Sequence, residues 1–71
     1  MKLHYYAETD SLYIDLNSKP SKQTQEIGNG LLIDLDAEGN IVGIDIDHAS
    51  QQLDLKTLEM IALPTVVTKV A

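Results

Sequence analysis

Residues 31–46, LLIDLDAEGNIVGIDI, decide the fold of this chain. Apolar and polar side chains largely alternate through Leu31–Leu35 and again through Ile41–Ile46, and this period of two is typical of half-buried β-strands. The intervening segment DAEGN at 36–40 suits a bulged turn in which Gly39 takes a left-handed conformation. The stretch therefore predicts an antiparallel β-hairpin.

The upstream sequence predicts three more strands of the same kind. Residues 3–6 and 12–16 form a second hairpin across the turn at 7–10, with alternating apolar positions in the later strand. Residues 22–27 are polar on both faces, which suits an exposed edge strand. The sequence therefore predicts an α+β, mainly β fold, namely an antiparallel meander of four to six strands with one C-terminal helix.

The helix is expected over residues 55–62, where apolar residues recur at helical spacing. Asp54 can cap its start, and Pro64 disfavours helical geometry at the residue before it. The β-prone residues that follow form an extended tail that can add a strand. We expect one domain, 1–71, composed of a sheet over 1–47, a helical segment over 48–63 and the tail over 64–71.

Composition narrows the function classes. The 71 residues contain five lysines, eleven carboxylates, no arginine and no cysteine, for a net charge of −6. Scattered lysines without arginine argue against nucleic-acid binding, and the absence of cysteine excludes disulfides and thiolate metal sites. No apolar run reaches the roughly 18 residues that span a bilayer, and no signal segment is apparent. We expect a cytoplasmic protein that contacts neither membrane nor nucleic acid.

The acidic hairpin also matches part of a calcium-loop pattern, with carboxylates spaced as in an EF-hand and glycine at the bend. An EF-hand loop joins two helices, however, whereas this one joins two strands, so we favour the hairpin. The alternative function is divalent-metal binding. Its candidate ligands are Asp34, Asp36, Glu38, Asp45 and Asp47.

No catalytic or cofactor-binding signature emerges from the sequence. The serines lie outside any nucleophile elbow, and Gly28-Asn29-Gly30 does not open a helix as a phosphate-binding loop would. A chain this short also has little room to enclose a substrate. We expect no cofactor and no enzymatic activity, and a third alternative is an enzyme whose site lies between subunits.

Two stretches resemble the opening and the close of a family of short prokaryotic proteins catalogued only as a domain of unknown function. YYAETDSLYIDL at 5–16 is similar to Y-D-x-x-x-D-A-L-Y-I-x-L, and IVGIDIDHAS at 41–50 is similar to V-V-G-I-E-I-x-x-A-S. The resemblance covers about residues 1–53, although Tyr6 and Ala7 stand where the family has Asp-Pro. It implies a small β-rich fold without established activity, and pairing of some members with small toxin-like proteins.

The function that we favour is that of a small non-enzymatic interaction module of uncharacterised role, which self-associates and can also bind a second protein, such as a small toxin-like one. A domain of this length buries only about 60% of its surface and often gains stability from association. The expected helix and tail leave apolar residues without an intramolecular partner, which suits a homodimer. The expected interface residues are Met60, Leu63, Val66, Val67 and Val70.

Overall fold

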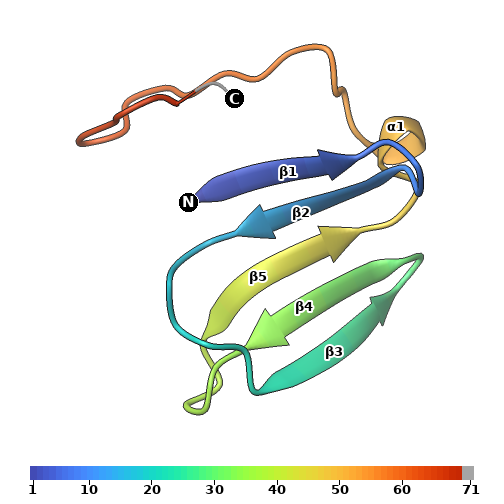
Figure 1. Ribbon diagram of the computed structural model, residues 1–71, viewed down its shortest axis with the longest axis vertical. Helices are drawn as coiled ribbons and strands as arrows, with labels where there is room; N and C mark the ends of the chain where they lie inside the picture. The colour runs from blue at the N-terminus through green and yellow to red at the C-terminus, as the bar shows by residue number, and fades with distance from the viewer. Residues whose placement is uncertain (70–71) are drawn as a thin grey trace.

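The computed structural model describes residues 1–69, which form a five-stranded antiparallel sheet, one short helix and an irregular tail (Figure 1). Each strand begins and ends within one residue of its predicted bounds, and the predicted fold class is confirmed. The elements are β1 (Lys2–Tyr6), β2 (Ser11–Asp15), β3 (Gln23–Gly28), β4 (Leu31–Leu35), β5 (Ile41–Ile46) and α1 (Ala49–Gln52).

The strand order β1-β2-β5-β4-β3 differs from a simple meander in one connection. Residues 16–22 carry the chain from β2 past β5 and β4 to the far edge, and β5 then returns to pair with β2. This order keeps the apolar strands together, because Ile14 lies opposite Ile44, which lies opposite Ile33. The polar strand β3 occupies an edge, where charged and polar side chains discourage aggregation.

Strand alternation gives the sheet two different faces. The apolar face carries no charged strand residue, whereas the polar face carries four carboxylates. Within the described chain only three apolar residues are buried, namely Leu12, Val42 and Ala49. The apolar face consists of Leu3, Tyr5, Leu12, Ile14, Gln23, Gln25, Leu31, Ile33, Leu35, Val42, Ile44 and Ile46, and the carboxylates of the polar face are Asp15, Glu26, Asp34 and Asp45.

The β4–β5 hairpin has the predicted bulged turn. The register shifts between Asp34 and Leu35, and Gly39 has a φ of +85°. The Asp36 backbone N–H donates to the Asn40 carbonyl at 2.9 Å, and the Gly39 N–H donates to the Asp36 carbonyl at 3.1 Å. The left-handed glycine closes the turn without the steric cost of a Cβ atom.

The predicted helix over 55–62 is wrong. The helix is Ala49–Gln52, and residues 55–62 are irregular. Asp54 makes a local turn instead of a cap, because its Oδ1 accepts the Lys56 N–H at 3.1 Å. An isolated eight-residue helix is marginal in water, and an irregular chain reaches farther per residue than the 1.5 Å rise of a helix. The apolar side chains of this segment can therefore spread along the sheet.

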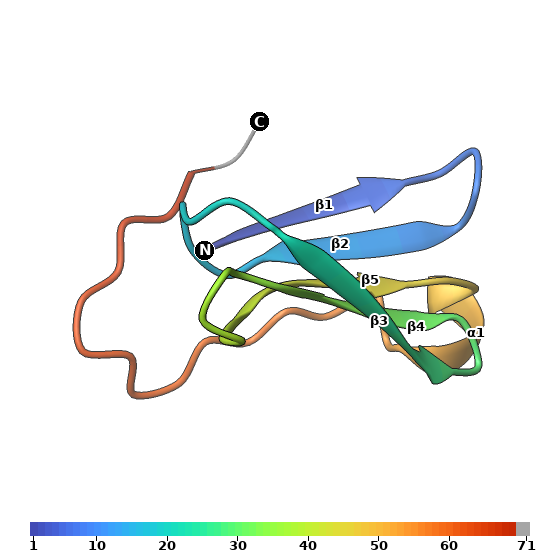
Figure 2. The ribbon, with the colours of Figure 1, turned by 90° about the horizontal axis from the view of Figure 1, so that it is seen from below.

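Residues 53–69, called the tail below, run back beside β1 toward the end of the sheet where the N-terminus lies (Figure 1). Most of the tail and α1 lie to the same side of β1 and β2 (Figure 2). No residue of the tail up to 69 forms a strand, so the tail does not extend the sheet there. Among residues 1–69, no helix has the length and apolar character needed to cross a membrane.

Candidate interaction surface

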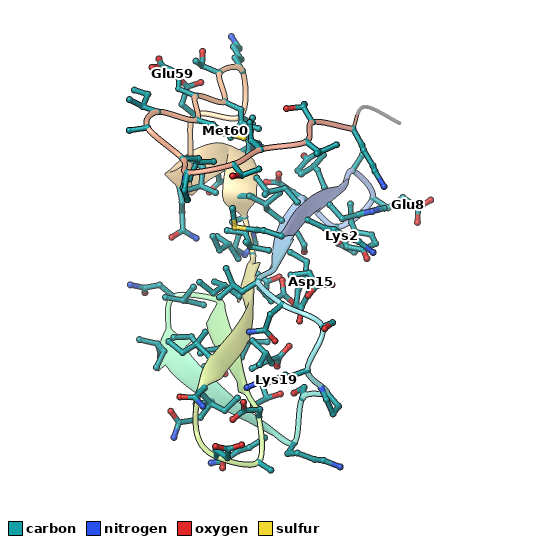
Figure 3. The ribbon with its side chains drawn as sticks, turned by 90° about the vertical axis from the view of Figure 1, so that its left-hand side faces the viewer. Lys2, Glu8, Asp15, Lys19, Glu59 and Met60 are labelled. Carbon is teal, nitrogen blue, oxygen red and sulfur yellow. The ribbon has the colours of Figure 1, made fainter. Side chains whose placement is uncertain are left out.

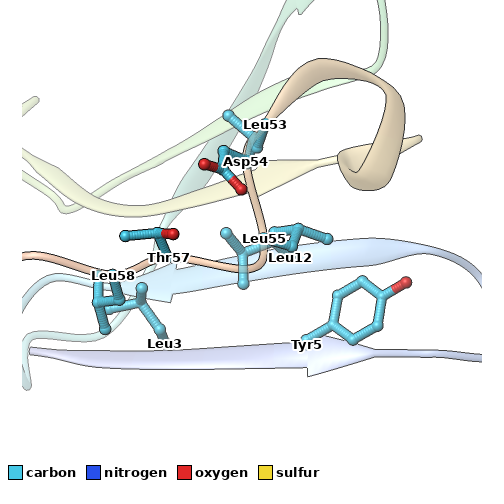
Figure 4. A pocket seen from close by; sticks show the side chains of 8 residues that line it. All are labelled: Leu3, Tyr5, Leu12, Leu53, Asp54, Leu55, Thr57 and Leu58. Carbon is cyan, nitrogen blue, oxygen red and sulfur yellow. The ribbon is translucent and has the colours of Figure 1, made fainter.

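The first half of the tail covers the β1–β2 part of the apolar face. Leu53, Leu55 and Leu58 face Leu3, Tyr5 and Leu12 across a groove of about 630 Å³ (Figure 4). All six side chains are apolar or aromatic, so their proximity removes hydrocarbon from water on both sides. The tail is associated with the sheet through these side chains, because none of residues 53–69 forms a strand.

A second groove, of about 400 Å³, continues along the same contact. In it Met60, Ile61 and Leu63 lie near Met1, Leu3 and Ile14. Four of the five expected interface residues remain exposed in the single chain, and Val70 lies outside the described residues. Their exposed fractions are 47% for Met60, 46% for Leu63, 54% for Val66 and 80% for Val67.

The other half of the apolar face is open. Ile33, Leu35 and Ile44 are half-buried by their neighbours in the sheet, and no described segment crosses the middle of β5, β4 or β3 in Figure 1. Figure 3 shows Glu59 and Met60 at the end of the molecule where β1 lies. The tail therefore lies against the β1–β2 half of the apolar face, and no described segment lies over the half-buried residues of the other half.

The polar face is organised around Asp34. The Tyr13 hydroxyl donates to Asp34 Oδ2 at 2.7 Å, and the Thr24 hydroxyl donates to Asp34 Oδ1 at 2.7 Å. Tyr13 reaches Asp34 by lying over Gly43, where a Cβ atom would come within 2.7 Å of the Tyr13 Cζ. The hydrogen bond to Asp34, with burial and the Asp34 charge, raises the pKa of Tyr13 to about 12. These groups form a tether between strands.

Asp45 lies beside this tether in a less favourable environment. Its Oδ1 atom is buried without a protein hydrogen-bond partner. Burial, followed by the charges of Asp47 and Asp34, raises the pKa of Asp45. Asp47 has a partner of its own, because the Ser11 hydroxyl donates to its Oδ1 at 3.1 Å. Asp45 is therefore the carboxylate of the polar face whose charged form is least favoured by its surroundings.

Sequence reasoning placed Asp10 only in a turn, yet it joins three elements. The Tyr5 hydroxyl donates to Asp10 Oδ1 at 2.8 Å, and the Ser50 N–H and hydroxyl donate to Asp10 at 3.0 and 2.7 Å. These bonds, with that of the Ser50 hydroxyl the largest influence, lower the pKa of Asp10. The sequence contained one indication of this role, because Asp10 and Ser50 both belong to the stretches that carry the family resemblance.

The candidate metal ligands serve different parts of the hairpin. Asp36 Oδ1 accepts the Glu38 and Asn40 N–H groups, each at 2.9 Å, as an aspartate does in a tight turn. Asp34 and Asp45 lie on the polar face. Within residues 1–69, no three metal-binding side chains are close enough together to hold an ion.

Comparisons with curated proteins and with solved structures find no match for this chain. A family model described as "Protein of unknown function (DUF2283)" matches residues 2–50. The match contains the whole sheet, the turn at Asp10 and the first residues of α1, which are the parts that carried the resemblance. Since it spans more than half of the 71 residues, the chain belongs to this family of proteins of unknown function.

Proposed function

We propose that this protein is a non-enzymatic module that acts by self-association, with the tail in the contact between copies. The observation that carries the proposal is the small core. Three buried apolar residues, Leu12, Val42 and Ala49, are all that residues 1–69 provide. At about 25 cal/mol per Å² of buried apolar surface, so few residues contribute little against the entropy of ordering the chain.

The distribution of polar groups supports the same proposal. The carboxylates of the sheet lie on the polar face, and Asp34 links strands by accepting the hydroxyl groups of Tyr13 and Thr24. Association through the polar face would bring like charges together, whereas association through the apolar face keeps them apart. The face free of charged strand residues is therefore the one available to a second copy.

We also propose that the protein has no enzymatic role, because of the contacts that its reactive side chains make. The hydroxyls of Tyr13 and Thr24 both donate to one carboxylate, Asp34, and the His4 ring lies 4.2 Å from the ring of Tyr6. Neither arrangement pairs a nucleophile with a base that a third group orients, which is the usual requirement for covalent catalysis. The polar face supports the sheet rather than a reaction.

Sedimentation velocity with light scattering tests the proposal at micromolar concentrations. The expected mass is at least twice the 7.8 kDa of the single chain. The double variant Met60→Lys/Val67→Lys should sediment as a single chain, because desolvating two ammonium groups is costly. Ser21→Lys/Gln51→Lys is the matched control, since both positions are exposed and the charge change is the same. A wild-type protein that stays at 7.8 kDa at high micromolar concentration would contradict self-association.

A further inference from the structure

The tail carries apolar side chains that stay mostly exposed beside its own sheet. Leu58, Ile61 and Val67 are 68%, 77% and 80% exposed, although Leu58 and Ile61 also line the grooves against β1 and β2. These three residues are called the tail ridge. Exposed apolar side chains gathered in one segment are typical of association surfaces.

The surface next to the ridge is the open part of the apolar face, Ile33, Leu35 and Ile44, called the open face. Leu58 and Ile61 lie on the same side of the sheet as the open face, because they line grooves with Leu3, which shares its face with Ile14, Ile44 and Ile33 across four strands. The molecule therefore presents the tail ridge beside β1, and next to it the open face formed by β5 and β4.

We propose that two copies associate face to face, with the tail ridge of each copy packed on the open face of the other. This inference rests on the proposed function and adds which surface meets which. A twofold axis requires that each contact occurs twice, with the partners exchanged. A ridge beside an open face satisfies this condition, because turning one copy by half a turn places each ridge over the other copy's open face.

The exposed area of the tail supports a second copy as the occupant. The ridge, together with Met60, Leu63 and Val66, is 46–80% exposed, which for six apolar side chains amounts to on the order of several hundred Å², a substantial part of the about 800 Å² that each partner buries in a standard interface. A contact of tail against tail would leave both open faces in water. Packing ridge on open face removes both surfaces from water in one association.

The charges of the two surfaces support the same pairing. The tail carries two carboxylates, Asp54 and Glu59, and two lysines, Lys56 and Lys69, so it brings no net charge to the contact. The open face has no charged residue. The carboxylates that give the chain its negative charge lie mostly on the polar face and in turns, where salt screens repulsion beyond about 8 Å.

Cross-linking between two single-cysteine variants tests the pairing, since the chain has no cysteine of its own. Ile61→Cys, with a mass tag, is mixed with Ile33→Cys and oxidised mildly. A disulfide requires Cα atoms within about 7 Å, so it reports close approach. We expect a mixed disulfide of one tagged and one untagged chain, well above the cross-linking of either variant alone. Such a product can form only between chains.

A second pair, Val67→Cys with Leu35→Cys, repeats the test in case one substitution disturbs folding, which circular dichroism monitors. Ile61→Cys with Ser21→Cys is the control, because Ser21 lies in an exposed loop. Cross-linking of Ile61→Cys alone that equals the mixture would show tail-to-tail contact and overturn this pairing, while leaving self-association intact. Absence of mixed product from both pairs in a sample that sediments as a dimer also overturns it. A wild-type monomer would overturn both proposals.

Discussion

Gly43 is where two strands and a tyrosine ring meet. The Tyr13 ring lies over this glycine so that its hydroxyl can reach Asp34 on β4, and a Cβ atom at Gly43 would come within 2.7 Å of the Tyr13 Cζ. The glycine therefore serves close approach and not an unusual backbone conformation, because its φ is not among the positive values. The sequence did not reveal this role, since it depends on which strands become neighbours.

Gly43→Ala should lower the free energy of unfolding by about 1–3 kcal/mol, the usual cost of overpacking. The penalty should be smaller in a Tyr13→Phe background, because the ring is then no longer tethered to Asp34 and can move aside. Urea unfolding of the four proteins measures this coupling. Gly39→Ala is the control, since nothing lies within 4 Å of its added Cβ and only its φ of +85° is strained. Equal penalties in both backgrounds would contradict the tether.

Asp45→Asn should stabilise the protein at neutral pH. Burial and the charges of Asp47 and Asp34 raise the pKa of Asp45 above the ordinary 3.8, so its favourable contribution is present below that value and is lost as pH rises through the folded pKa. The neutral amide avoids this loss. The melting temperature of the variant should exceed that of wild type at about pH 7 and lose its advantage at about pH 3.

Glu26→Gln provides the comparison for Asp45→Asn, because it removes the same charge from an exposed position on β3 of the same face. If Glu26→Gln raised the melting temperature as much as Asp45→Asn does, the change in net charge alone would account for the stabilisation. In that case the local environment of Asp45 would not explain the stabilisation.

At the scale of elements, local pattern predicted the strands but not the helix. In a strand, successive side chains point to opposite faces, so the pattern of apolar residues in 31–35 and 41–46 can be recognised from neighbouring residues alone. The spacing of Leu55, Leu58 and Ile61 is compatible with a helix, yet the segment is irregular and lines two grooves with β1 and β2. Tertiary contact thus decides the conformation of a segment whose own helix would be marginal.

The β1–β2 turn and α1 are joined by Asp10, and this joint should depend on pH. Its hydrogen bonds lower the pKa of Asp10 below 3.8, so they stabilise the fold above that pH and are lost as pH falls through the folded value. Asp10→Asn should be less stable than wild type near pH 7, and the difference should close in acid. Asparagine tolerates the left-handed φ of +52° at this position, so backbone strain does not obscure the result.

Urea unfolding followed by circular dichroism at several pH values measures the Asp10→Asn difference. Glu8→Gln is the control, because it removes one charge from an exposed position in the same turn. Ser50→Ala should weaken stability in wild type much more than in the Asp10→Asn background. A stability difference for Asp10→Asn that stays constant from neutral pH into acid would contradict the assigned role.

For the whole molecule, the sequence predicted the class of fold and an apolar tail, but not their arrangement. The exposure of Met60, Leu63, Val66 and Val67 follows from too few apolar partners in a short chain. The pairing of β2 with β5 joins residues about 30 positions apart, and local alternation does not specify which distant strand becomes a neighbour. The Tyr13–Asp34 tether and the Asp10–Ser50 joint both depend on such long-range contacts.

Folding coupled to association makes stability depend on protein concentration, because only the folded chain binds its partner. For a two-state dimer, a hundredfold rise in concentration adds about 2.7 kcal/mol and raises the melting temperature by on the order of 10 °C for two chains of this size. Scanning calorimetry with repeated scans to verify reversibility measures this shift. Met60→Lys/Val67→Lys should melt at a temperature independent of concentration, whereas Ser21→Lys/Gln51→Lys should retain the wild-type dependence. A wild-type melting temperature that does not change over that range would mean that the exposed tail and open face are stable in water without a partner.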